Sequence, residues 1–350
     1  MWLALIGILL FVLVGVFSNV IAGEKGLIQF SPHEIPEEGT PYSPPGTIIS
    51  TGIAGETRTY VFGSDQLGRD VAARLVHGTR IALRVGLFSS LISLGIALLL
   101  GALAGYYGDE RHRVTVYQLL VLILGVILTH YYSYEGAFYE GENGAWVWSF
   151  LSYSLRALVG VGLVLLLCHL LKRLETFSIA LRWDTLVVKL IEVFKSIPSL
   201  FLLLAVFAII RKPSVVAVII IIGLIRWPFL TRIIRAEVFQ VKQSSYIQNA
   251  KLLGIPDIAV YAKHILPNIY PPILIVTALN IGTAILVESS LSFLHIGLPI
   301  TEVSWGRMLS DARDYIPAWW LALGPGVMIF IAILSFNTIS QRLSHHFESN

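Results

Sequence analysis

The sequence predicts an all-α polytopic membrane protein with about eight transmembrane helices. Of its 350 residues, 55% are hydrophobic and only 13% are charged, whereas soluble domains carry about 25% charged residues. Apolar runs also recur along the whole chain, and most approach the roughly 20 residues that a helix needs to cross the hydrocarbon core. Composition and segment length therefore both favour the membrane class.

Net charge and cysteine content narrow the class further. The net charge of +3 is too small to suggest nucleic acid as a partner. The apolar composition makes the lipid bilayer the expected surroundings. The single cysteine, Cys168, lies inside an apolar run. It excludes a disulfide within the chain, and we expect it to be a small packing or lipid-facing residue.

Eight runs are candidate spans. The first lacks the basic start of a signal peptide and is long for one, which favours an uncleaved N-terminal anchor. The runs are 2–22, 82–104, 114–131, 155–171, 187–210, 214–230, 269–290 and 319–340.

Basic residues in short loops indicate the orientation, because such loops face the cytoplasm. An N-terminus in the cytoplasm places most of them on that side, together with the C-terminal tail 343–350. The acidic, aromatic loop 132–154 then lies outside, and only Arg211-Lys212 argues against this arrangement. The cytoplasmic basic residues are Arg111, Arg113, Lys172, Arg173, Arg182, Arg232, Arg235, Lys242, Lys251, Lys263 and Arg342.

The connector 23–80 would lie outside the membrane. It is rich in Pro, Gly and Glu, and we expect little regular structure before residue 60. It ends in the motif FGSDQLGRD, where Asp65 is expected to cap a short helix that begins near Gln66. The motif continues to Arg74 and Arg80, and its charged residues from Arg69 onward would lie at the outer mouth of the second span. We call the residues below the external motif, which is either functional or a charged interfacial helix with internal ion pairs. They are Asp65, Gly68, Arg69, Asp70, Arg74 and Arg80.

A polar, basic loop, 231–268, separates two apolar runs. The sequence predicts a short helix from Tyr246 to Leu253 that ends at Gly254, where the backbone φ is positive. A second helix would run from about Asp257 to His264 and end before Pro267. Such a loop is suited to inserting into a cleft on another protein. The alternative is an amphipathic helix on the membrane surface.

Polar groups inside predicted spans are candidates for a translocation path. We expect Glu288 either to face this path or to form a buried ion pair with an arginine. Arg226 is expected to extend its charged end toward the membrane surface. The candidate path residues are Asn280, Thr283, Glu288 and Ser289.

No catalytic residues, cofactor or metal site are expected. The nine histidines form no ligand or acid–base pattern, and His345-His346 is expected to be solvated in a mobile tail. No Gly-x-x-x-x-Gly-Lys-Ser/Thr motif is present, so nothing predicts ATP hydrolysis on this chain. A membrane enzyme is therefore disfavoured. A secondary transporter or channel uncoupled from ATP remains an alternative, although the internal repeats typical of secondary transporters are not evident.

Several motifs in order resemble the permeases of binding-protein-dependent ABC transporters, in the oligopeptide, dipeptide and nickel branch, and specifically their C-type subunit. The resemblance covers about 62–108 and 184–342. The motifs are GSDQLGRD, GALAGYYG, FKSIPSLFLL, YIQNAKLLG, HILPN, ESSLSFL, SWGRML, WWLALGPG and SFN.

The resemblance implies a six-helix type I importer core with an inserted two-helix hairpin, a permease transmembrane domain at 81–342 and a coupling loop at 231–268. It also implies a bacterial inner-membrane location and three kinds of protein partner: a second permease subunit, two cytoplasmic ATPase subunits and an external substrate-binding protein. Peptides or a related solute such as a nickel chelate would be the cargo. The implied coupling residues are Tyr246, Ala250, Lys251, Leu253, Gly254, His264, Leu266, Pro267 and Asn268.

Two departures from the family stand out. Gln248-Asn249 replaces small or acidic residues that are common before Ala250. Residues 109–183 form an insertion with two of the predicted spans, which we expect to be a hairpin that leaves and re-enters the same face. It is expected to be a lipid-facing addition or, alternatively, a contact site for another envelope component.

Overall fold

The structure is a computed structural model that describes residues 2–23, 27–36, 39–50, 57–109, 112–115, 162, 178–209 and 213–348. The chain divides into two compact units. Unit 1 comprises Met1–Tyr106 and Val187–Asn350, and unit 2 is Tyr107–Leu186. Unit 2 covers nearly the same stretch of chain as the expected insertion 109–183. The expected spans 114–131 and 155–171 lie outside the described residues.

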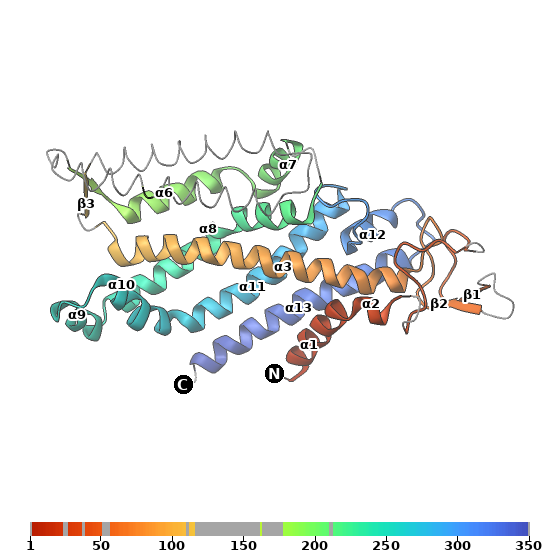
Figure 1. The fold of residues 1–350 in the computed structure, drawn as a ribbon, viewed down its shortest axis with the longest axis horizontal. Helices are drawn as coiled ribbons and strands as arrows, with labels where there is room; N and C mark the ends of the chain where they lie inside the picture. Colours follow the sequence, from red (N-terminus) through yellow and green to blue (C-terminus); the bar gives the residue numbers. More distant parts are fainter. Residues whose placement is uncertain are drawn as a thin grey trace. The chain divides into compact units, whose positions relative to one another are not determined.

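Four long helices form the body of unit 1 (Figure 1). Within the described residues, four helical segments are long and apolar enough to cross a membrane, or five if one bent pair is a single span. The mostly helical membrane fold is thus confirmed. The four segments are α3 (Val71–Ala102) with the π-helical turn η1 (Leu103–Tyr107), α8 (Val215–Lys242), α11 (Leu266–Phe293) with the shorter helices before it, and α13 (Trp320–Glu348).

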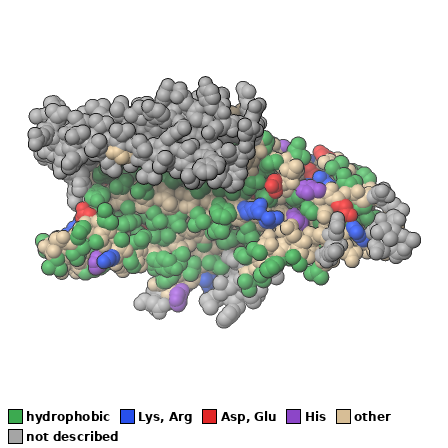
Figure 2. All heavy atoms as spheres, viewed as in Figure 1, with side chains coloured by type: hydrophobic (Ala, Val, Ile, Leu, Met, Phe, Trp, Pro, Cys, Tyr) green, Lys and Arg blue, Asp and Glu red, His purple; other side chains and the backbone are tan. Residues whose placement is uncertain are grey.

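These helices have a loop end and a strand end. Figure 1 shows α9 (Ser245–Leu252) and α10 (Asp257–Val260) at the loop end. It shows β1 (Thr47–Ser50), β2 (Thr57–Tyr60) and α12 (Trp305–Asp311) at the strand end. Figure 2 shows apolar side chains covering much of the visible surface between these ends. Exposed apolar side chains along helices of this length are what a lipid-facing surface requires.

The first two expected spans differ from the helices observed. The first run is split at Phe17 into α1 (Trp2–Val16) and α2 (Ser18–Ile21). The helix α3 begins eleven residues before the predicted start at 82, because Asp70 caps it by accepting a hydrogen bond from the Ala73 N–H. The connector therefore ends near residue 70, not 80.

Proline affects two other spans differently. The run 187–210 is broken into α6 (Trp183–Ser196) and α7 (Ser199–Ile209), which meet at 79° beside Pro198. Pro228, in contrast, lies inside α8, which continues to Lys242. Proline is tolerated inside a membrane helix where neighbouring groups satisfy the freed backbone, and Pro228 is buried.

The loop 231–268 is also more helical than expected. Its first part is the end of α8, followed by α9 and α10. The prediction that the second helix stops before Pro267 is wrong: α10 continues through the π-helical turn η3 (Tyr261–Ile265) into α11. The Leu266 N–H donates to the Tyr261 carbonyl, five residues back. This wider turn precedes Pro267, which lies in the first turn of α11, where a proline needs no hydrogen-bond donor.

The connector contains more structure than predicted. The antiparallel strands β1 and β2 pair with Thr47 opposite Tyr60. Tyr60 is fully buried, stacks on Phe30 with ring centroids 5.1 Å apart, and donates to the Gly68 carbonyl at 2.6 Å. This hairpin forms a small core of its own over the start of α3.

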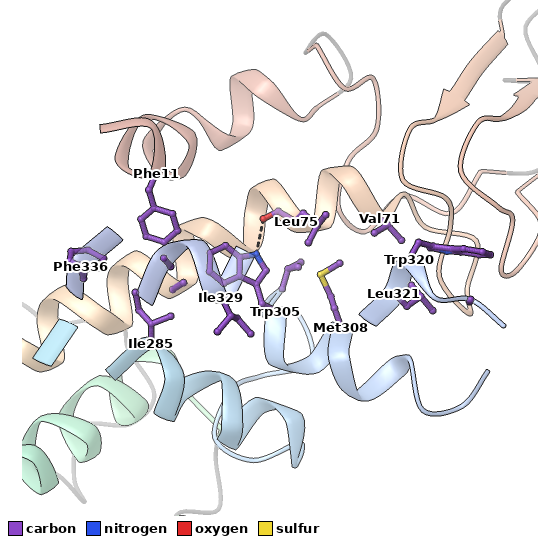
Figure 3. Close-up of a cluster of buried hydrophobic side chains, with 14 residues drawn as sticks. Phe11, Val71, Leu75, Ile285, Trp305, Met308, Trp320, Leu321, Ile329 and Phe336 are labelled. Carbon is purple, nitrogen blue, oxygen red and sulfur yellow. Dashed lines mark hydrogen bonds between the residues drawn. The ribbon is translucent and has the colours of Figure 1, made fainter. Parts of the chain in front are cut away.

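A larger core cluster joins α1, α3, α12 and α13 (Figure 3). Trp305 lies at its centre, where its indole N–H donates to the Leu75 carbonyl at 2.9 Å. Phe11 lies 5.7 Å from Trp305 and 6.3 Å from Phe336, measured between ring centroids. The N-terminal helix is thus packed into the bundle by aromatic contacts.

In unit 2, the described residues form a short antiparallel sheet of β3 (His112–Thr115) and β4 (Ser178–Leu181). Beside it, Asp109 accepts hydrogen bonds from Arg182 and from the backbone and hydroxyl of Thr185. These contacts bring the two ends of the insertion together. At the C-terminus, α13 extends to Glu348, so His345 and His346 are helical rather than part of an irregular tail.

Candidate functional site: the helical loop and its strand-end counterpart

The loop helix α9 presents a buried side and an exposed side. Ile247 and Ala250 are buried against the chain. After Leu253 the chain turns at Gly254, whose φ is +76°, which confirms the predicted positive φ. The Gly254 N–H donates to the Lys251 carbonyl and the Ile255 N–H to the Ala250 carbonyl. These two bonds form a Schellman motif, which satisfies the last carbonyls of the helix.

On both sides of this turn, large apolar side chains are exposed. Leu252, Leu253 and Ile258 are exposed by 85%, 81% and 81%, and Tyr246 is exposed by 44%. We call these four residues the loop tip. An apolar group on an otherwise polar loop indicates a contact surface for a partner.

Tyr106 fastens this loop to the end of α3. Its hydroxyl donates to Asp257 Oδ1 at 2.6 Å, and the Lys251 Nζ lies 4.4 Å from its ring centroid. Tyr106 lies in η1, and isolated π-helical turns are common at functional sites. The loop therefore has a direct polar connection to α3, in addition to its covalent connections to α8 and α11.

A Tyr106→Phe substitution should loosen the loop without changing its shape. It removes the bond to Asp257 but keeps the ring beneath Lys251. Because hydrogen bonds to charged groups contribute about 1.5–3 kcal/mol, we expect backbone amides in 245–260 to exchange at least about tenfold faster. Hydrogen–deuterium exchange in detergent measures this. Tyr270→Phe, on the exposed surface of α11, is the control, and unchanged exchange in Tyr106→Phe would contradict the connection.

The remaining predicted loop residues are structural or exposed. The Asn268 side-chain amide donates to the His264 carbonyl at 2.6 Å, which holds the start of α11. Leu266 and His264 are half-buried, and Pro267 and Asn268 are exposed. Lys251 contacts Tyr106 rather than pointing freely into solvent.

At the strand end, the GSDQLGRD motif forms a buried ionic network. Asp65 is fully buried, accepts from the Leu67 and Arg69 N–H groups, and pairs with Arg69 at 2.7 Å and with Arg74. Arg74 also lies 3.5 Å from Asp311 of α12. The predicted helix near Gln66 is wrong, because Asp65 closes a turn and Asp70 caps α3 instead. The internal ion pairs of the alternative interpretation are present.

Gly68 and Arg80 are the other two residues that the sequence predicts for this end. Gly68 lies in the turn with φ +79° and accepts from Tyr60. Arg80 is half-buried, one helical turn beyond His77 on α3. The network connects the connector, α3 and α12, and therefore fixes the strand end of the bundle.

Asp70 makes this end sensitive to pH. Burial, reinforced by the charges of Asp65 and Glu34, raises its pKa from 3.8 to about 6, despite hydrogen bonds from the Ala73 and Ala72 backbone. The folded state therefore binds the proton more tightly than the unfolded state. The free energy of unfolding should fall as pH rises from 3.8 to about 6, by about 3 kcal/mol in total.

We therefore expect a lower unfolding temperature at pH 7 than at pH 5 in detergent. Asp70→Asn keeps a capping side chain and should make the unfolding temperature less dependent on pH. Part of the pH dependence should remain, because burial also raises the pKa of Asp311. An equally steep pH dependence in the variant would show that another group is responsible.

The ESSLSFL and SWGRML motifs pack α12 against α11. Glu288 accepts from the hydroxyls of Ser292 at 2.7 Å and Ser304 at 2.8 Å. Gly306 lies so close that a Cβ there would overlap the Ser289 carbonyl. No ion pair to Glu288 forms among the described residues, which corrects that alternative. Glu288 and Ser289 are buried in the chain's own interior.

Asn280 forms a polar contact between three helices. Its Oδ1 accepts from the Arg226 Nε at 3.0 Å, and its Nδ2 donates to the Ser90 hydroxyl at 3.1 Å. The expectation that Arg226 extends toward the membrane surface is thus wrong, because its guanidinium turns to this buried amide. Thr283 is half-buried and donates to the Leu279 carbonyl. Which residues line a path stays a prediction.

Sequence reasoning missed Tyr106 and Asp311 as members of these sites, and it predicted the wrong contact for Arg226. Tyr106 lies within GALAGYYG, but nothing local connects it to Asp257, which is 151 residues away. Asp311 lies two residues after the SWGRML motif, and its pairing with Arg74 likewise depends on tertiary structure. Arg226 was the one usable signal in the sequence, because an arginine inside a predicted span usually has a polar partner and a function.

These features define a polytopic helical membrane protein with an exposed apolar loop at one end and a buried ionic network at the other. Residues 174–350 match the family described as binding-protein-dependent transport system inner membrane component. The chain belongs to this family. It is a permease subunit of an ABC importer and not an enzyme.

Curated relatives are peptide and glutathione permeases. The chain is 28% identical over 299 residues to the dipeptide transport system permease protein DppC of Alkalihalophilus pseudofirmus, covering 85% of this chain and 74% of the relative. It is 32% identical to a putative peptide transport system permease protein of Brucella suis, covering 60% and 72%. It is 27% identical to the glutathione transport system permease protein GsiD of Pectobacterium atrosepticum, covering 83% and 72%.

Proposed function

We propose that this chain is the C-type permease subunit of an ATP-driven importer of di- or oligopeptides in a bacterial cytoplasmic membrane. The relatives' printed names support a peptide-like substrate. A nickel chelate or another small solute is the second candidate, because the matched motifs form packing contacts and do not enclose a substrate.

The loop tip is the observation that carries the coupling role. Leu252, Leu253 and Ile258 are exposed on a loop fastened to α3 by Tyr106. A cytoplasmic ATPase that binds this surface can move the loop, and α3, α8 and α11 then move with it. The full importer would contain a second permease subunit, two ATPase subunits and an external binding protein.

This function assigns a side of the membrane to each end. The loop end, with α9 and α10 of the loop 231–268, lies in the cytoplasm, and the strand end, with the connector, lies outside. Both chain termini lie at the ends of α1 and α13 that point away from the strands (Figure 1). This supports termini that are both cytoplasmic, with 1–22 as an anchor and 109–183 as an inserted hairpin.

Reconstitution tests the proposal. The two permease subunits and the ATPase subunits are reconstituted in liposomes that contain ATP, and the binding protein is added outside. A set of di- to pentapeptides is then tested for uptake and for stimulation of ATP hydrolysis. We expect ATP-dependent uptake of at least one peptide class. Uptake driven by an ion gradient without ATP would support an uncoupled transporter and contradict the proposal.

A further inference from the structure

A cationic group lies deep in the bundle without a balancing charge. Arg226 lies eleven residues into α8, about 16 Å along the helix from Val215, which is roughly half the hydrocarbon thickness of a bilayer. It is half-buried. Charged side chains at this depth are costly and usually serve a function.

The side chain of Arg226 is held by one of its nitrogens. Its Nε donates to Asn280, which is fully buried and braced in turn by Ser90. Among the described residues, no acceptor is in hydrogen-bond range of the two terminal nitrogens, and no carboxylate pairs with this guanidinium.

The acidic residue in α11 does not supply the missing charge. Glu288 lies eight residues beyond Asn280, about 12 Å along the helix, and is bound by serine hydroxyls. The guanidinium carbon of Arg226 instead lies 6.0 Å from the ring centroid of Phe229. Phe229 is 41% exposed. An oriented guanidinium with two free nitrogens is suited to bidentate binding of a carboxylate.

We propose that Arg226, positioned by Asn280, is an anion-binding site in the translocation path and binds a carboxylate of the transported solute. Every peptide with a free C-terminus carries such a group. The peptide identity rests on the proposed function, but the anion site does not. Lipid phosphates lie at the bilayer surface, outside the hydrocarbon core, so the ligand of a site halfway through the bilayer is the transported solute.

The first test uses thiol chemistry in the assembled importer and needs no known substrate. The chain's single cysteine, Cys168, is replaced by serine, and Phe229→Cys is introduced. Anionic sulfonatoethyl and cationic trimethylammonioethyl methanethiosulfonates are compared. A positive charge about 6 Å away attracts the anion. We therefore expect the ratio of the anionic to the cationic rate to be at least about tenfold above the ratio that the same two reagents show with a free thiol in solution. Adding Arg226→Gln should bring the ratio back to the free-thiol value.

Leu224→Cys provides the matched control. Leu224 is 46% exposed, but it lies about 200° around α8 from Arg226. We therefore expect both reagents to modify Leu224→Cys much more slowly than the anionic reagent modifies Phe229→Cys. Absence of reaction at Phe229→Cys would show that the site is outside an aqueous path. A ratio unchanged by Arg226→Gln would also overturn the proposal. So would a ratio equal to the free-thiol value from the start, because a neighbouring subunit would then neutralise the arginine.

The second test measures transport. Arg226→Gln should lower uptake of a peptide with a free carboxylate at least about tenfold, as expected for loss of a charged hydrogen-bond pair, and Arg226→Lys should retain more. Arg342→Gln, on an exposed position of α13, is the control. Equal losses of uptake in Arg226→Gln and Arg226→Lys, together with a lower unfolding temperature, would show that Arg226 only stabilises the helix packing and would overturn the proposal. If no peptide is transported by the unmodified importer, the proposed function fails while the thiol result still stands.

Discussion

Replacing Leu253 with glutamate is expected to abolish ATP-driven uptake while the protein still inserts into the membrane. Leu253 is exposed and makes no core contact, so the folded chain tolerates a charge there. A partner that buries this leucine would have to desolvate the carboxylate, which costs several kcal/mol without a pairing group. We therefore expect at least a hundredfold loss of uptake and loss of ATPase subunits from the purified complex.

Ile300→Glu is the matched control, because Ile300 is 90% exposed but lies just before α12 at the strand end. The ATPase subunits should still co-purify with this variant. A companion change is Gly254→Pro, which forces a negative φ on a residue at +76° and should stop transport by distorting the loop. Normal uptake in Leu253→Glu would contradict the role of the loop tip.

Replacing Asp65 with alanine is expected to cause the largest loss of stability. Asp65 neutralises Arg74, which is buried, and the remaining partner of Arg74, Asp311, is 3.5 Å away. Removing one member of a buried ionic network leaves an uncompensated charge, which costs about 3–5 kcal/mol. The unfolding temperature in detergent should fall sharply, with Asp65→Asn intermediate because it still accepts backbone hydrogen bonds.

The exposed pair of Lys189 and Glu192, 2.8 Å apart, is the comparison. Both side chains are more than half exposed, so Glu192→Ala should leave the unfolding temperature unchanged. If Asp65→Ala were as mild as Glu192→Ala, the strand-end network would not be what holds α3 to α12.

The sequence predicts the class of fold well because hydrophobicity and length alone decide whether a helix can cross a bilayer. The positive φ at Gly254 was also predictable, since a helix ending in glycine before Ile255-Pro256 has few other solutions. Helix ends were less predictable. The sequence predicts a short helix capped by Asp65, whereas Asp65 closes a turn and Asp70 caps α3.

Contacts between distant segments could not be predicted in the same way. The effect of a proline depends on its tertiary neighbours, so Pro198 coincides with a bend whereas Pro228 does not interrupt α8. The partners of Tyr106 and Arg226 lie 151 and 54 residues away. Helical periodicity says which side of a helix a residue occupies, but not which residue of another helix it meets.

Site-specific photo-crosslinking from position 253 tests the central claim most directly. A photoreactive amino acid replaces Leu253 in the assembled importer, and the same residue replaces Ile300 in a second preparation. The loop-tip assignment predicts an ATP-dependent crosslink to the ATPase subunit from position 253 and none to that subunit from position 300. A crosslink from position 253 to the external binding protein, or no crosslink to an ATPase in any nucleotide state, would contradict it.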